Sequence, residues 1–263
     1  MISKIIAIAK QTAKENLYYR FDLILYIFNF IIEITVYVFI WLSIYSSGNK
    51  ILDMSFEDIT TYYILVVTLN PIISWGINEC MGEAIREGEI LRELLNPISY
   101  FTYYFGIRIG ELIEAIIVSI FTFIICSLLF GILLPSSILN FIFFLIVICL
   151  SVLLIYLFEL IIGNMAFYTN SIWGIEVFKR AILSVFSGMI APITLFPIYL
   201  QKIANFLPFK DCIYTPISIY FGELDCLQIL YVILKQCIWI ILFFIIAKVL
   251  FKKTIKNLTV NGG

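Results

Sequence analysis

Long apolar stretches recur along the chain, and shorter stretches that contain charged residues separate them. A helix can cross the hydrocarbon core of a membrane when about 20 consecutive residues are mainly apolar. The third stretch is expected to break or tilt near Arg108, Glu111 and Glu114, because charged side chains are unfavourable in lipid. These three residues are also expected to form a structural i,i+3 cluster where the stretch enters the membrane. In total the pattern predicts six membrane spans: Phe21–Tyr45, Thr60–Ile77, Phe105–Leu134, Ile138–Ile162, Ile172–Ile190 and Leu227–Leu250.

Residues 1–20 are predicted to form a helix that lies in the membrane interface. In Met1–Tyr19, apolar side chains fall on one side of such a helix, and Lys4, Lys10 and Lys14 fall largely on the other. This pattern is typical of interfacial helices. A frayed basic leader is the alternative. A cleaved secretory signal is not expected, because no small-residue cleavage site follows.

Residues 191–225 are apolar but contain four prolines, Pro192, Pro197, Pro208 and Pro216. The segment is too rich in proline for a plain span and too apolar for an open extracellular loop. Irregular backbone is stable at membrane depth only where protein covers it. We therefore expect short half-helices that re-enter the outer leaflet.

The composition fits a chain whose solvent is lipid. Of the 263 residues, 62% are hydrophobic and 13% are charged, whereas soluble domains have about 45–50% apolar and about 25% charged residues. The sequence therefore predicts an all-α membrane protein with a single transmembrane domain over residues 1–263. The net charge is −1, and no basic stripe suited to nucleic acid is present, so no nucleic-acid partner is expected.

The chain contains no histidine. It therefore cannot build a His-ligated metal site or a Ser-His or Cys-His nucleophile. No catalytic residue and no metal site is predicted, and no cofactor is expected on this chain. The six cysteines have no CxxC spacing. Only Cys212 and Cys226 are placed to meet outside the membrane, and whether they form a disulfide stays open.

Lysine and arginine are distributed unequally between the two sides of the predicted spans, and such an excess marks the cytoplasmic side. They gather before the first span, between the second and third, near the start of the fifth at Lys179 and Arg180, and after the sixth. Both termini are therefore predicted to be cytoplasmic in a multi-pass protein of the cell membrane. Asp22 and Glu159 lie near cytoplasmic span ends and are predicted to be interfacial.

The loop at residues 78–100 carries seven charged residues within Glu79–Tyr100. Gly88 divides it into Glu79–Glu87, which should continue the second span into water, and Glu89–Leu95, which should form a short amphipathic helix. Asn96 and Pro97 end that helix, because a residue before proline avoids the helical region. Such a helix suits insertion into a groove of a soluble partner. A solvated turn packed on its own bundle is an equal alternative.

Two sets of motifs, in this order and spacing, resemble type-2 ABC exporter permeases, whose six-span permease is separate from its ATPase. The resemblance covers essentially the whole chain. The first set lies in the charged loop, and the second lies before and within the proline-rich segment. The matching stretches are Ile85–Ile90 and Leu94–Tyr100, then Phe186–Pro192, Phe196–Pro197, Leu207–Phe209 and Thr215–Ile217.

This resemblance implies that Glu89–Leu95 is a coupling helix that receives ATP-driven movement from a separate ATP-binding subunit. ATP and Mg would bind to that subunit, and the present chain lacks a phosphate-binding loop motif, so it is not expected to be an enzyme. Arg86, Glu87 and Arg92 would be the polar contacts. The full set implied for coupling is Arg86, Glu87, Gly88, Glu89, Leu91, Arg92, Leu94 and Pro97.

The resemblance also implies a dimer with a second copy or a related permease, embedded in membrane lipid. The substrate would be amphipathic or hydrophobic, such as a drug-like compound, peptide or lipid, exported by alternating access at the dimer interface. The alternative is a secondary transporter or channel with no ATPase partner, although no inverted repeat and no filter-like loop is evident. A membrane enzyme is disfavoured by the lack of histidine.

Glu33 and Lys235 lie well inside the first and sixth predicted spans, at similar depth. Charged residues within spans usually face a partner or a cavity. We expect the two to pair or to line a shared polar cavity. The alternative is that Lys235 extends to the interface while Glu33 is protonated.

Overall fold

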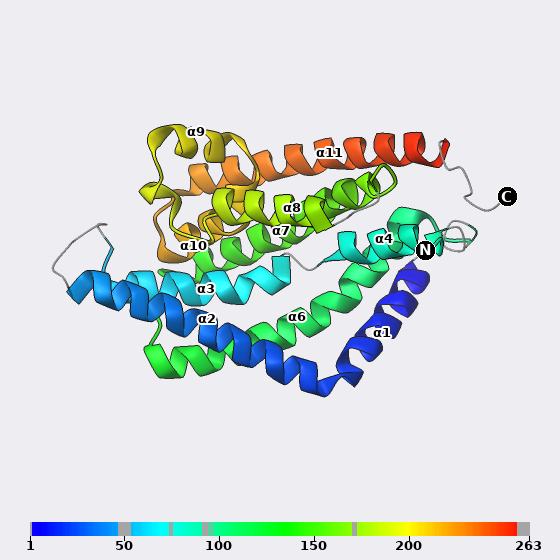
Figure 1. The fold of residues 1–263 in the computed structure, drawn as a ribbon. Helices are drawn as coiled ribbons and strands as arrows, with labels where there is room; N and C mark the ends of the chain where they lie inside the picture. Colours follow the sequence, from blue (N-terminus) through cyan, green and yellow to red (C-terminus); the bar gives the residue numbers. More distant parts are fainter. Residues whose placement is uncertain are drawn as a thin grey trace.

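The computed structural model of the protein describes residues 2–46, 54–73, 76–90, 95, 97–169 and 173–256. In these ranges every regular element is a helix (Figure 1). The predicted all-α class is therefore confirmed. The longest helices run roughly side by side as a bundle, and α1 lies obliquely to them at the end where α4 and the last turns of α11 also lie (Figure 1).

Five stretches of helix are long and apolar enough to cross a membrane within the part of the chain that the structure describes. An isolated helix satisfies its own backbone hydrogen bonds, which is the condition for entering lipid. One of the five is the pair α3 and α4 taken together. The helices are α2 (Arg20–Ser46), α3 (Phe56–Ile73) with α4 (Ile77–Arg86), α6 (Tyr100–Phe130), α7 (Ile138–Met165) and α11 (Cys226–Lys256).

The fifth predicted span, Ile172–Ile190, corresponds to the shorter helix α8 (Trp173–Phe186) of 14 residues. At 1.5 Å per residue α8 is about 21 Å long, which is less than the ~30 Å of a hydrocarbon core. The chain turns away directly after it, at Gly188, whose φ is +89°. The predicted count of six spans is therefore not confirmed, and α8 does not reach across a bilayer alone.

The second predicted span is divided into two helices. Thr60–Ile77 was expected to be one helix, but α3 ends at Ile73 and α4 begins at Ile77. A helix is present where the continuation of this span was expected, because α4 runs to Arg86. The third predicted span was expected to break at its charged positions, but α6 is one continuous helix of 31 residues.

Between α8 and α11 lies the proline-rich segment (residues 191–225), which contains four short helices. Proline fixes φ near the helical value, so it favours the start of a helix and disfavours its interior. A proline precedes three of the four helices directly, and the fourth carries Pro216 in its first turn. The helices are η1 (Ile193–Leu195), α9 (Ile198–Phe206), η2 (Phe209–Cys212) and α10 (Tyr214–Phe221).

The N-terminal helix α1 (Ile2–Tyr18) packs closely against α6. Gly106 and Gly110 make this approach possible. A Cβ at Gly106 would lie 2.9 Å from the Cβ of Ile8, and one at Gly110 would lie 2.7 Å from the carbonyl oxygen of Ala9. A side chain at either glycine would push α1 away. At the other end of the contact, Lys4 Nζ donates to the Pro97 carbonyl at 2.9 Å.

Candidate functional site

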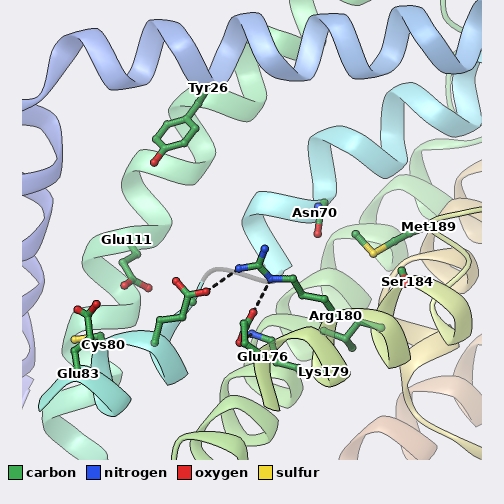
Figure 2. Close-up of a pocket in the computed structure, with 13 residues that line it drawn as sticks. Tyr26, Asn70, Cys80, Glu83, Glu111, Glu176, Lys179, Arg180, Ser184 and Met189 are labelled. Carbon is green, nitrogen blue, oxygen red and sulfur yellow. Dashed lines mark hydrogen bonds and ion pairs between the residues drawn. The ribbon is translucent and has the colours of Figure 1, made fainter. Parts of the chain in front are cut away.

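A cavity of about 620 Å³ lies among α2, α3, α4, α6 and α8 (Figure 2). It is open on one side, and polar or charged side chains supply most of its lining. Acidic side chains outnumber basic ones on this wall, so the cavity disfavours an anionic ligand. The charged lining residues are Glu79, Glu83, Glu111, Glu176, Lys179 and Arg180.

The first two turns of α8 supply an ion-pair cluster. Residues three and four positions apart share one face of a helix, and Glu176, Lys179 and Arg180 have this spacing. Lys179 Nζ lies 3.1 Å from one carboxylate oxygen of Glu176, and Arg180 Nε lies 2.8 Å from the other. Figure 2 shows Arg180 between the carboxylates that it contacts. Glu176 is thus neutralised by two cations.

Lys179 also reaches α7, where its Nζ lies 3.2 Å from Glu159 Oε1. The two side chains are 2% and 0% exposed. Glu159, predicted to be interfacial, is therefore buried within the protein, and Lys179 is buried with it. A charge inside a low-dielectric interior is tolerated only when it is paired and hydrogen-bonded. Glu159 meets this condition through Oε1, which is bonded to Lys179.

Helix α4 joins the cluster through Asn78 and Glu79. The Asn78 side chain is fully buried. Its Oδ1 accepts from Lys179 Nζ at 2.6 Å, and its Nδ2 donates to Glu176. Glu79 Oε1 lies 2.7 Å from Arg180 Nη2 at the cavity surface. The helix that leads into the charged loop is therefore bonded directly to α8.

Arg108 of α6 lies at the point where α3 ends, and it is 1% exposed. Its Nη2 donates to the carbonyls of Ile72 and Ile73 at 2.6 and 3.1 Å. The last carbonyls of a helix have no partner within it and carry partial negative charge, so a cation stabilises them. Nη1 lies 3.7 Å from Glu111 Oε2, which confirms the predicted i,i+3 contact.

Lys235 of α11 has a similar role in the proline-rich segment. Its Nζ lies 2.7 Å from Asp211 Oδ2 and donates to the carbonyls of Asn205 and Leu207 at 2.5 and 3.0 Å, where α9 ends. The predicted pairing with Glu33 is therefore wrong, because Asp211 is the partner of Lys235. Glu33 instead lies on the exposed face of α2.

The residues implied for coupling are described only in part. Arg86, Glu87 and Glu89 are exposed. Arg86 Nη2 lies 3.8 Å from Glu87 Oε1. Gly88 has a φ of +78°, which favours glycine and accounts for the division of the loop at this position. Pro97 accepts the hydrogen bond from α1. Leu91, Arg92 and Leu94, with most of the predicted coupling helix, lie outside the described residues.

Several residues of the site were missed by sequence reasoning, namely Asn78, Lys179 and Asp211. For Lys179 a signal was available: Glu176, Lys179 and Arg180 fall inside one apolar stretch, and charges at such positions usually pair. No comparable signal marked Asn78, since an amide at a span end has many ordinary explanations. Asp211 lies in a segment whose fold is set by its prolines rather than by a periodic pattern.

A family model of known transporter proteins matches the chain. The family model described as ABC-2 family transporter protein matches residues 31–262, which is most of the chain. The matched range includes the ion-pair cluster, the proline-rich segment and all the cavity-lining residues except Tyr26. No curated protein matches the chain. The family match and the candidate spans together indicate a multi-pass membrane protein that takes part in transport. The chain belongs to the ABC-2 family of transporter proteins.

Proposed function

We propose that this chain is the permease subunit of an ATP-driven exporter and that a separate subunit binds ATP and Mg. The observation that supports this most directly is the position of α4. It continues a candidate span, leads into the charged loop and is bonded to α8 beside the polar cavity. A movement imposed on the loop from outside would therefore reach the cavity wall.

The ATP-binding subunit would contact the coupling loop (residues 78–100), with the side chains already named from Arg86 to Pro97. The apolar positions of the short amphipathic helix would enter a groove of that subunit, and the exposed charges Arg86, Glu87 and Glu89 would surround it. Two permeases, identical or related, would enclose the transport path. The substrate would be amphipathic or hydrophobic and would move by alternating access.

In this proposal the sixth crossing consists of α8 together with residues that follow it, because α8 alone is too short. The proline-rich segment would then lie in the outer leaflet, covered by α7 and α11, and α1 would lie in the cytoplasmic interface. The acidic cavity between α4, α6 and α8 would be part of the path on the cytoplasmic side.

Loss of the ATP-binding subunit is expected when Leu94 is replaced by Asp, because a carboxylate would have to enter an apolar groove. The chain, tagged and purified from the cells that produce it, should bring with it a subunit that has a phosphate-binding loop motif and ATPase activity. Leu134→Asp is the matched control, since Leu134 is exposed between α6 and α7, at the opposite end of the bundle. Normal recruitment by the Leu94 variant would refute the docking site, and purification without any ATPase would favour a secondary transporter or channel.

The orientation can be tested with the native thiols, none of which is in a disulfide among the described residues. Cys80 and Cys226 are exposed, on α4 and at the start of α11 respectively, and Cys212 is buried. Burial also raises the pKa of the Cys212 thiol, so it should react slowly. In cells, a membrane-impermeant maleimide is expected to label a variant that retains only Cys226 and not one that retains only Cys80. The reverse result would invert the proposed orientation.

A further inference from the structure

Helix α8 is bonded at both of its ends to the second span, which is divided into α3 and α4. At its first turns, Asn78 of α4 is hydrogen-bonded to Lys179 and Glu176. All three side chains are buried, which makes these bonds stronger than exposed ones. The nearby contact between Glu79 and Arg180 is exposed and contributes little in comparison. Asn78 is therefore the main bond from α4 to α8.

The other end of α8 is bonded to α3. Directly after α8 the chain makes a turn over Ser187–Ile190. Tyr62 Oη donates to the Gly188 carbonyl at 2.7 Å, and Tyr63 Oη donates to the Ile190 carbonyl at 2.9 Å. At Gly188 a Cβ would lie 2.8 Å from Tyr62 Oη, and φ is +89°. Glycine is needed there for both reasons.

The same turn is bonded to the proline-rich segment. The amide of Tyr214, at the start of α10, donates to the Ser187 carbonyl at 3.0 Å. The Tyr214 ring also packs against Tyr62, with centroids 6.3 Å apart. A displacement of the outer end of α8 would therefore displace α10, and α10 packs against α7.

Helix α8 is hydrogen-bonded to α4 at its start, and the turn that follows it is hydrogen-bonded to α3. We propose that α8 carries movement of the coupling loop to the proline-rich segment, with Asn78 as the positioning residue at one end and Tyr62 and Tyr63 at the other. This inference rests on the proposed function, since it assumes that an ATP-binding subunit moves the loop.

The test uses the whole complex in lipid nanodiscs, in a background whose native exposed cysteines are replaced. Spin labels are attached at Tyr199→Cys on α9 and Leu128→Cys near the end of α6, two exposed positions. With unmodified Asn78, trapping the ATPase with ADP and vanadate should change the distance between the labels. With Asn78→Leu, the ATP-binding subunit should remain bound to the permease and the distance change should be lost. A merely structural role for Asn78 would not separate these two readouts.

A second variant keeps the test decisive if Asn78→Leu does not assemble. Tyr62→Phe with Tyr63→Phe removes the hydroxyl donors at the far end of α8, away from the coupling loop, and should lose the same distance change. Tyr37→Phe is the matched control: Tyr37 stacks on Tyr63 with centroids 4.2 Å apart, and its hydroxyl has no hydrogen bond to the 187–190 turn among the described residues.

A distance change of normal size in Asn78→Leu or in the double tyrosine variant would overturn the inference. So would the absence of any change in a complex that hydrolyses ATP, and in that case the proposed function would stand. If no ATPase accompanies the unmodified chain, the proposed function itself fails, and the inference fails with it. The two failures are therefore distinguishable.

Discussion

Replacing Lys179 by Met is expected to reduce strongly the amount of folded protein in the membrane. Glu159 is fully buried and would lose its ion pair, whereas Glu176 would keep Arg180 and Asn78. Removing one partner of a buried pair destabilises a protein by roughly 3–5 kcal/mol, and the whole stability of a domain is only about 5–15 kcal/mol. The yield of monodisperse protein and its thermal unfolding in detergent measure the effect.

The matched variant combines Lys179→Met with Glu159→Gln, so that no buried carboxylate is left without a cation. It should recover much of the lost stability, because replacing both partners of a buried pair is far less harmful than removing one. If Lys179→Met alone is as stable as the unmodified protein, the ion pair between α7 and α8 does not stabilise the bundle. Equal damage in both variants would instead point to the contact between Lys179 and Asn78.

Lys235→Met is expected to have the second largest effect, chiefly on the proline-rich segment. The substitution leaves Asp211, which is buried, without its cation, and it removes the donor to the Asn205 and Leu207 carbonyls. We again expect a loss of roughly 3–5 kcal/mol. Limited proteolysis of the segment, thermal unfolding and transport-linked ATPase activity should all report it.

Two comparisons make the Lys235 result specific. Lys202→Met changes an exposed lysine of the same segment, on α9, and should behave like the unmodified protein. Adding Asp211→Asn to Lys235→Met should recover part of the stability but not all of it, because the carbonyls at the end of α9 still lack a donor. Unchanged proteolysis and activity in Lys235→Met would show that the ion pair is dispensable.

The sequence predicts the long spans well because each is a local pattern. The expected spans Phe21–Tyr45 and Leu227–Leu250 fall within α2 and α11. An apolar run of this length can satisfy its backbone only as a helix in lipid. The bounds of these elements therefore do not depend on what packs beside them.

The fifth predicted span is not confirmed, because α8 is only 14 residues long. Counting apolar side chains treated Ile172–Ile190 as one crossing, and Lys179 and Arg180 served as markers of the cytoplasmic side. In the structure, Lys179 is buried by Glu159 and Asn78, which come from other helices. A hydropathy pattern depends only on residues that are close in sequence. It therefore cannot distinguish a solvated charge from one that is paired with another helix.

The candidate site was predicted only where its contacts are close in sequence. Arg108 and Glu111 share one face of a helix, and their contact was anticipated. Lys235 and Asp211 meet because a chain with several prolines folds back against α11, and no periodic pattern describes that path. Depth in the membrane suggested Glu33 instead, but equal depth does not make two residues neighbours.

The close contact of α1 with Gly106 and Gly110 has a consequence for how the chain is made. During synthesis α1 emerges before α6, so the surface on which it rests is not complete until Gly110 has been translated. Until then α1 needs another surface to bind. The lipid headgroup layer is such a surface, because a basic amphipathic helix is stable there. The exposed lysines of α1 would thus bind lipid headgroups before Ala9 and Ala13 pack against α6. A fusion or deletion at the N-terminus should therefore disturb biogenesis earlier than it disturbs the finished transporter.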